Sequence, residues 1–161
     1  MNVPGAFGAR RPFVLGIGGT TRASSSSERA LRAALEVARE LGAKTDSIVG
    51  NNLLFPIYEP LESGRPPRVQ NFLDFVRQSD GLIISSPGYH GTVSGLIKNV
   101  LDYLEDLRGD DRPYLSGRAV GCIACAAGSQ AIGSTLVALR SVVHASRMAD
   151  ADGSWNQHRA G

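Results

Sequence analysis

The sequence predicts an α/β fold built on one doubly wound parallel sheet with helices on both faces. Short apolar runs alternate along the chain with segments that repeat apolar residues at the helical period, which is typical of this architecture. The chain has 161 residues, of which 42% are hydrophobic and 20% are charged. That length suits a single domain with one buried core, and the composition is that of an ordinary globular protein.

The first half of the alternation starts with the apolar run 13–17, which predicts a strand. A helix is predicted next, because Ser25 and Glu28 have the spacing of a capping box and Gly42 stands at the far end. The apolar stripe of this helix consists of Leu31, Ala34, Leu35, Ala38 and Leu41. A weaker strand is predicted over residues 45–49, and a proline-rich loop follows it.

The second half continues the same alternation. Strands are predicted over residues 81–85, the clearest in the chain, and 119–126. Three more helices are predicted from stripes formed by Val69, Phe72, Leu73 and Val76, by Leu96, Ile97, Val100, Leu101, Leu104 and Leu107, and by Ile132, Leu136, Leu139 and Val143. A fifth strand would need another apolar run after His144, and the sequence has none, so the last strand is doubtful.

These patterns divide the chain into a flexible N-terminal tail (1–11), one α/β domain (12–145) and an atypical C-terminal tail (146–161). The net charge of +2 is too small to predict nucleic-acid binding. The sequence has no run of about 18 apolar residues that would span a membrane. The N-terminal residues lack the apolar core of a secretory signal, so we expect a cytoplasmic protein that binds neither nucleic acid nor membranes.

Cys122 and Cys125 have a C-x-x-C spacing, which suggests redox chemistry or zinc binding. Both lie in a predicted strand, where residues three apart point to opposite faces, so their sulfur atoms should not meet. The sequence has no second cysteine pair and no histidine close to them. We therefore expect two small buried side chains and no metal site.

The loop after the first predicted strand, residues 18–27, has the composition of a phosphate-binding loop. It contains Gly18 and Gly19, then Arg22 among several hydroxyl side chains, and it leads directly into a helix. Glycines let the backbone approach an anion, while hydroxyl groups, a guanidinium and a helix N-terminus stabilise negative charge. The spacing is neither GxGxxG nor that of a P-loop. The alternative interpretation is a flexible serine-rich loop that merely precedes a helix.

The loop after the third predicted strand, residues 86–99, carries Tyr89 and His90 between glycines. Ligands of doubly wound sheets bind beyond the carboxyl ends of the strands, where the strand order reverses. In the order 2-1-3-4-5 that point lies between the first and third strands. An aromatic side chain there can lie against a planar ring while the backbone contacts the ring edge. Alternatively, Tyr89 and His90 belong to an ordinary exposed loop, and Lys98 and Asn99 belong to the solvated side of a helix.

Together these two loops resemble the NADPH-dependent FMN reductase family, flavodoxin-like proteins that include flavin, quinone, azo-dye and chromate reductases. The resemblance spans about residues 13–144 and rests on a G-S-x-R-x-x-S-like phosphate loop and a P-x-Y-x-x-S/T-x-x-G-x-L-K-N-like flavin loop. The second motif matches from Pro87 through Asn99, whereas the first has Thr20 where the family usually has serine. The resemblance implies a flavodoxin-like sheet with the strand order 2-1-3-4-5, whose last strand has no convincing counterpart here.

Carried over to this chain, the resemblance implies FMN-binding residues in three loops. The residues that would bind the phosphate are Thr20, Arg22, Ser25 and Ser27, with Gly19 in the same loop. The residues that would lie against the ring and its pyrimidine edge are Pro87, Gly88, Tyr89, His90 and Gly91. A third loop after the fourth predicted strand is small enough to let a ring pack closely, and it adds Ala127 and Gly128.

The function implied by the resemblance is an FMN-dependent oxidoreductase that takes hydride from NADPH or NADH. The electrons would pass to a small acceptor, which could be free flavin, a quinone, an azo compound or a metal oxyanion. The cofactor carries this chemistry and the protein supplies positioning, so we predict no catalytic side chain. Family members are usually dimers or tetramers, so we expect a homodimer or homotetramer. If free FMN is the acceptor, a flavin-dependent monooxygenase would be the downstream partner.

Two other functions stay open on the sequence alone. One is a flavodoxin-type electron carrier without a substrate of its own, which the net charge of +2 disfavours because such carriers are usually strongly acidic. The other is a relic in which the altered C-terminus has disabled the flavin site and left a structural role. Oxidation of NADPH separates the first function from the carrier, and a protein that binds no flavin would favour the relic.

Overall fold

A largely parallel sheet forms the centre of the structure, a computed structural model that describes residues 10–62 and 64–148. The strands are β1 (Phe13–Gly18), β2 (Lys44–Val49), β3 (Gly81–Tyr89), β4 (Thr92–Val93) and β5 (Ala119–Cys125). The parallel strands lie in the order β2-β1-β3-β5, and β4 pairs antiparallel with the end of β3. This order confirms the predicted doubly wound, flavodoxin-like sheet over its first four predicted strands.

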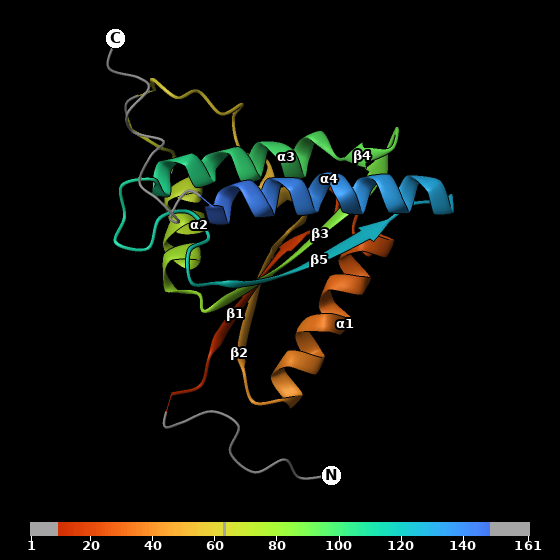
Figure 1. The fold of residues 1–161 in the computed structure, drawn as a ribbon, viewed down its shortest axis with the longest axis horizontal. Coiled ribbons are helices and arrows are strands. Elements are labelled where there is room, and N and C mark those ends of the chain that lie inside the picture. The colour runs from red at the N-terminus through yellow and green to blue at the C-terminus, as the bar shows by residue number, and fades with distance from the viewer. Residues whose placement is uncertain (1–9, 63, 149–161) are drawn as a thin grey trace.

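Helices cover both faces of this sheet (Figure 1). The helices are α1 (Ser26–Glu40), η1 (Gly50–Leu53), α2 (Pro67–Gln78), α3 (Gly95–Asp102), η2 (Tyr103–Leu107) and α4 (Ser129–Met148), where η1 and η2 are 3₁₀ helices. Helix α1 covers one face, and α2, α3 and α4 pack on the opposite face. Among the described residues, no helix is both long and apolar enough to cross a bilayer.

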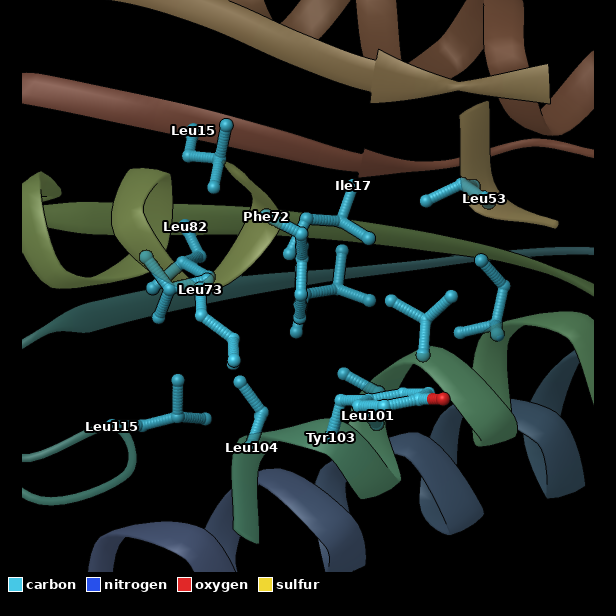
Figure 2. Packing of buried hydrophobic residues seen from close by; sticks show 14 of the residues in the cluster. Leu15, Ile17, Leu53, Phe72, Leu73, Leu82, Leu101, Tyr103, Leu104 and Leu115 are labelled. Atoms are coloured by element: carbon cyan, nitrogen blue, oxygen red, sulfur yellow. The ribbon is translucent and has the colours of Figure 1, made fainter. Parts of the chain in front are cut away.

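The larger part of the hydrophobic core lies on the face covered by α2, α3 and α4. Figure 2 shows Leu15 and Ile17 of β1 pointing from the sheet toward Phe72 and Leu73 of α2. All four side chains are almost fully buried. Leu15 and Ile17 are two residues apart along β1 and so share one face of the sheet, whereas Phe72 and Leu73 belong to the buried stripe 69, 72, 73 and 76 of α2. The core therefore fixes β1 and β3 in the middle of the sheet, and their carboxyl ends lie side by side.

The helix that follows β1 begins where the sequence predicts. The Ser25 hydroxyl accepts a hydrogen bond from the Glu28 amide at 3.3 Å and caps the helix. At the other end, Gly42 has a φ of +100°, a left-handed conformation that favours glycine just past a helix C-terminus. The first strand and the first helix are thus joined by the short loop 19–25, which is fixed at both ends.

The largest departure from the predicted elements concerns the segment after residue 85. Strand β3 continues to Tyr89, and a two-residue turn at His90 and Gly91 returns the chain into β4. Both turn residues have positive φ, +52° and +79°, as in a type I′ hairpin turn. The predicted loop is therefore largely a β-hairpin. The apolar pattern missed it because Ser86 and Pro87 are unusual in a central strand.

Two helix boundaries also differ from prediction. The helix expected through Leu107 ends as α3 at Asp102 and continues as the 3₁₀ helix η2. Helix α4 runs to Met148, beyond the predicted apolar stripe, which ends at Val143. The doubtful last strand would fall within residues 149–161, which lie outside the described residues.

Candidate functional site

A cleft of about 760 Å³ opens at the carboxyl ends of β1, β3 and β5. Doubly wound sheets bind their ligands at this edge, and small-molecule sites have volumes of about 300–1,000 Å³. One end of the cleft is polar and is formed by the loop after β1 and the first turn of α1. The other end is largely apolar and is formed by β3, the loop after β5 and the start of α4. The cleft therefore suits a ligand with one anionic end and one apolar end.

The polar end concentrates groups that stabilise negative charge. Its lining residues are Thr20, Thr21, Arg22, Ser25, Ser26 and Ser27. The Arg22 guanidinium makes no hydrogen bond or ion pair with the rest of the described chain, so it is free to meet a ligand. The first amides of α1, those of Ser26 and Ser27, have no acceptor within the helix. A guanidinium, several hydroxyls and a helix N-terminus together form a surface suited to a phosphate.

The apolar end is open on one side and bounded by the sheet on the other. Its lining residues are Pro87, Tyr89, Ala124, Cys125, Ala126, Ala127 and Ile132. Pro87 and Cys125 face each other in the β3–β5 register. Tyr89 and Ile132 keep 53% and 38% of their surfaces exposed, so both lining residues offer apolar surface that a ligand in the cleft can contact. The small residues after β5 leave room for a flat group to approach the backbone.

The structure brings part of the predicted cofactor-binding set together around this cleft. The predicted residues that line it are Thr20, Arg22, Ser25, Ser27, Pro87, Tyr89 and Ala127. The other predicted residues lie just outside the lining. Gly19 packs against Glu28, Gly88 packs against α4, and Gly128 accepts a hydrogen bond from the Ile132 amide at 3.1 Å.

His90 and Gly91 occupy the hairpin turn, and neither lines the cleft. The turn needs positive φ at both positions, which explains the glycine without any ligand. The Thr135 hydroxyl of α4 donates to the Thr92 carbonyl at 3.3 Å and ties this hairpin to the helix. A contact between this turn and a ligand stays a prediction.

The sequence analysis did not select several lining residues as ligand-binding: Thr21, Ser26, Ala124, Cys125 and Ile132. Ala126, which also lines the cleft, belongs to the third predicted loop. Thr21 and Ser26 stand inside the predicted loop, so their composition could have found them. Ile132 was assigned only to the apolar stripe of its helix. Its place at the cleft depends on how the first turn of α4 packs, which is a tertiary feature.

The cysteines depart from the expectation that both are buried, because both are half-buried and neither is in a disulfide. They lie on β5, which pairs only with β3 among the described strands and so keeps one edge open. As expected, the two side chains do not meet: Cys122 packs against the core, whereas Cys125 lines the cleft. Burial raises the pKa of the Cys122 thiol, whereas the Arg140 charge partly opposes that rise.

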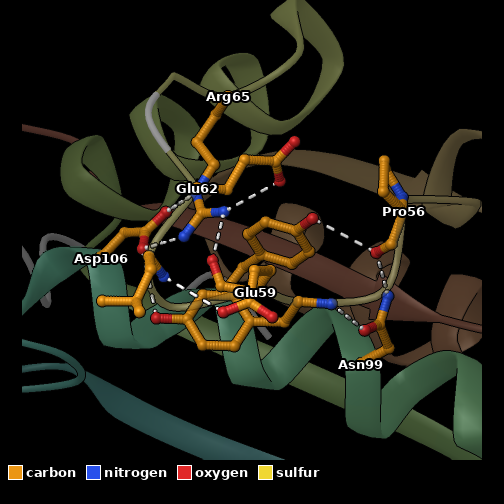
Figure 3. A network of polar contacts seen from close by, with 9 residues as sticks. Pro56, Glu59, Glu62, Arg65, Asn99 and Asp106 are labelled. Carbon is orange, nitrogen blue, oxygen red and sulfur yellow. Dashed lines mark hydrogen bonds and ion pairs between the residues drawn. The ribbon is translucent and has the colours of Figure 1, made fainter.

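Asn99 does not lie on a solvated helix side, contrary to one interpretation of the sequence. Its side chain donates to the Pro56 carbonyl at 2.8 Å and accepts from the Tyr58 amide at 2.9 Å (Figure 3). An amide side chain both donates and accepts, so it can form the hydrogen bonds that a neighbouring strand would otherwise make with this short stretch of backbone. Asn99 therefore fixes the loop that follows η1 against α3. Lys98, in contrast, is solvated and pairs with Asp102 one turn later.

Arg65 anchors the other end of the same loop. Its guanidinium donates to both carboxylate oxygens of Asp106, at 2.7 and 2.9 Å, and lies 4.9 and 5.1 Å from the ring centres of Tyr58 and Tyr103. The side chain is only 7% exposed, and hydrogen bonding to Asp106 raises the pKa of Arg65. This cluster lies away from the cleft lining and holds the framework around it.

Within the part of the chain that the structure describes, no group of three or more His, Cys, Asp or Glu side chains could hold a metal ion. The cleft itself contains the Cys125 thiol, hydroxyls and a guanidinium, which do not form a metal-binding set.

Comparisons with known proteins agree with this geometry. The family model for NADPH-dependent FMN reductase matches residues 12–160. An NAD(P)H-dependent FMN reductase of Pseudomonas aeruginosa is 30% identical over 118 residues, covering 71% of this chain and 60% of that protein. A probable NADPH:quinone oxidoreductase of Oryza sativa subsp. japonica is 38% identical over 101 residues, covering 59% of this chain and 51% of that protein. The chain thus spans only part of the length of these relatives.

Among solved structures, FerB, a flavoenzyme NAD(P)H:(acceptor) oxidoreductase from Paracoccus denitrificans, is similar with a TM-score of 0.69. The alignment covers 83% of this chain and 71% of that chain at 19% sequence identity. A flavodoxin, WrbA-like protein from Agrobacterium tumefaciens is similar with a TM-score of 0.58 at 14% identity. At these identities the likeness concerns the fold.

Proposed function

The chain belongs to the NADPH-dependent FMN reductase family, and from that premise we propose that it binds FMN in the cleft and accepts hydride there from NADPH or NADH. The observation that carries the proposal is the division of the cleft into an anion-binding end and an apolar end. FMN has the same division, a phosphate at one end of a ribityl chain and a flat ring system at the other. The residues present therefore fit the cofactor that the family implies.

In this proposal the loop after β1 holds the phosphate. Arg22 supplies the charged contact, the amides of Ser26 and Ser27 donate from the start of α1, and Thr20 and Thr21 add hydroxyls. Ser25 contributes less directly, since its hydroxyl already accepts the Glu28 amide. These groups anchor one end of the cofactor and so orient the other end.

The flat ring would lie between the strand end that carries Pro87 and Tyr89 and the small residues of the loop after β5. Pro87 and Ala126 exclude water from one side, while Tyr89 is exposed enough to lie over a ring edge. When bound, FMN supplies the hydride acceptor and passes electrons to a second substrate, and the protein contributes orientation rather than a proton-transfer group.

We propose a planar conjugated acceptor, free flavin or a quinone, for the second half of the reaction. The support is the open apolar rim formed by Tyr89 and Ile132, which offers a flat molecule contact area but few polar partners. An azo compound would use the same surface. A metal oxyanion would have to compete for the polar end, where the phosphate is expected.

The test is an anaerobic absorbance experiment. Purified protein is supplied with FMN, desalted to remove unbound cofactor and mixed with NADPH. Retained flavin whose visible absorbance bleaches on mixing supports a reductase. Retained flavin that does not bleach with NADPH or NADH supports a carrier, and the absence of saturable FMN binding in a titration would refute the proposal.

The phosphate end is tested by Arg22→Gln, with Arg29→Gln as the matched control on the exposed side of α1. A charge-assisted hydrogen bond contributes about 1.5–3 kcal/mol, so Arg22→Gln should weaken FMN binding by about 10- to 100-fold. Binding of riboflavin, which has no phosphate, should change little. Equal losses for FMN and riboflavin would contradict the assignment of Arg22 to the phosphate.

A further inference from the structure

The side chain of Glu28 lies beside both ends of the loop 19–25, with its carboxylate at Ser24 and its Cβ near Gly19. Glu28 is only 8% exposed, and one of its oxygens, Oε2, accepts a hydrogen bond from the Ser24 amide at 3.2 Å. Ser24 has a φ of +57°, a left-handed conformation that serine rarely adopts without a compensating contact. At the other end of the loop, the Glu28 Cβ lies 3.2 Å from the position a Gly19 side chain would occupy. The Glu28 side chain therefore forms a hydrogen bond with one end of the loop and packs closely against the other end.

The charge of this carboxylate is matched by Arg32, one helical turn further along α1. The Arg32 guanidinium donates to Oε1 of Glu28 from Nε at 3.0 Å and from Nη2 at 2.8 Å. Each carboxylate oxygen thus has a separate partner: Oε2 holds the loop and Oε1 holds the arginine. A negative charge at a helix N-terminus is favourable by itself, but here it stands beside the surface proposed for a phosphate. Without Arg32 it would repel that phosphate.

We propose that Glu28 is a positioning residue that sets the shape of the phosphate-binding loop, and that Arg32 neutralises it so that the loop can accept a dianion. The inference rests on the proposed function for the nature of the ligand, but the loop-shaping role of Glu28 stands on the contacts with Ser24 and Gly19. In this arrangement the loop is already formed before the cofactor binds. A preformed site loses less entropy on binding than a loop that must order around its ligand.

The first test needs no cofactor. Amide hydrogen exchange over residues 20–25 is measured in Glu28→Ala, Glu28→Gln and, as control, Glu36→Ala, which removes an exposed carboxylate of the same helix. Glu28→Ala should speed exchange of these amides by about tenfold or more, because Ser24 loses its acceptor. Glu28→Gln keeps a carbonyl oxygen for the Ser24 amide and should stay close to the wild type. Unchanged exchange in Glu28→Ala would overturn the loop-shaping role.

The second test separates charge from shape by comparing FMN with riboflavin. Arg32→Gln leaves the Glu28 carboxylate unpaired, and a unit charge about 8 Å from a dianion in water-like surroundings weakens binding by about fivefold. FMN affinity should fall by this factor while riboflavin affinity stays within about twofold. Adding Glu28→Gln to Arg32→Gln removes the repulsion and should restore FMN affinity, which a purely structural role of Arg32 would not do. Arg39→Gln, at the far end of the helix, is the control.

The outcomes distinguish this inference from the proposed function. If the wild-type protein binds neither FMN nor riboflavin, the proposed function fails and hydrogen exchange alone decides the role of Glu28. If the wild type binds FMN but the double variant binds it no better than Arg32→Gln, the neutralising role of Arg32 is refuted. Equal effects of Arg32→Gln on FMN and riboflavin would refute it as well.

Discussion

Replacing Gly88 by alanine tests whether the hairpin at the edge of the cleft depends on close packing against α4. A Cβ at this position would lie 2.5 Å from Thr135 Oγ1 and 3.0 Å from the Ala126 Cβ. Thr135 is fully buried, and its hydroxyl donates to the Thr92 carbonyl, so it cannot turn away without losing that bond. The clash can be relieved only if the hairpin and α4 move apart.

The expected cost combines two effects. Overpacking of a well-packed interior costs about 1–3 kcal/mol, and loss of the Thr135 hydrogen bond costs about 1 kcal/mol. Gly88→Ala should therefore lower the free energy of unfolding by about 2–4 kcal/mol, measured by urea denaturation followed by far-ultraviolet circular dichroism. Because Tyr89 directly follows Gly88, the same variant should also weaken riboflavin binding.

Two further variants make this prediction specific. Gly133→Ala places its Cβ in open space on the exposed side of α4, so it should raise the free energy of unfolding by about 0.5–1 kcal/mol. Thr135→Ala alone should be destabilising, yet combined with Gly88→Ala it should be more stable than Gly88→Ala alone, because the clashing oxygen is gone. A cost of less than about 0.5 kcal/mol for Gly88→Ala, or no gain in the double variant, would refute the packing argument.

Three further predictions concern groups away from the cleft lining. Arg65→Lys keeps the charge but loses the paired hydrogen bonds to its carboxylate, so the free energy of unfolding should fall by about 1–3 kcal/mol; an unchanged urea midpoint would contradict this. The Phe13 amide donates to the Asp80 carboxylate at 2.8 Å, and this hydrogen bond lowers the pKa of Asp80. The ionised Asp80 carboxylate therefore stabilises the fold fully above about pH 4, and this stabilisation is lost as the pH falls through the lowered pKa. Asp80→Asn should therefore make the free energy of unfolding, measured by urea at several pH values, fall less steeply in acid than in the wild type. Burial raises the pKa of Cys122. In a Cys125→Ser background, the alkylation rate of Cys122 should therefore rise at a higher pH than the alkylation rate of a free thiol does. An inflection at the same pH as a free thiol, or at a lower pH, would argue against burial as the cause.

The elements that were predicted well are those whose signals are local. A strand of apolar residues, a serine that caps a helix and a glycine just past its end each depend on a few neighbouring residues, and β1 and α1 confirm all three. The loop between them was located as well, because the strand before it and the helix cap after it are both local signals. Binding of a phosphate by these residues stays a prediction.

The features that were missed depend on contacts between distant segments. Cys125 lies at the cleft because β5 pairs with β3 in a register that sets it opposite Pro87, and no local pattern encodes that register. One interpretation of the sequence put Asn99 on the solvated side of its helix, yet its side chain bonds to backbone more than forty residues earlier. A periodicity argument cannot find such a bond, since it assigns faces and not partners.

The motif from Pro87 to Asn99 is explained by these distant contacts as much as by a ligand. Its first part lies at the cleft, through Pro87 and Tyr89, whereas its turn glycine is required by the hairpin. Ser94 caps α3 by accepting the Ile97 amide at 3.2 Å, and Asn99, on the same helix, ties down the loop after η1. One short segment therefore orients the strand end, starts the helix and fixes a neighbouring loop. Substitutions in its second half should change the cleft by moving its framework, even though those residues do not line it.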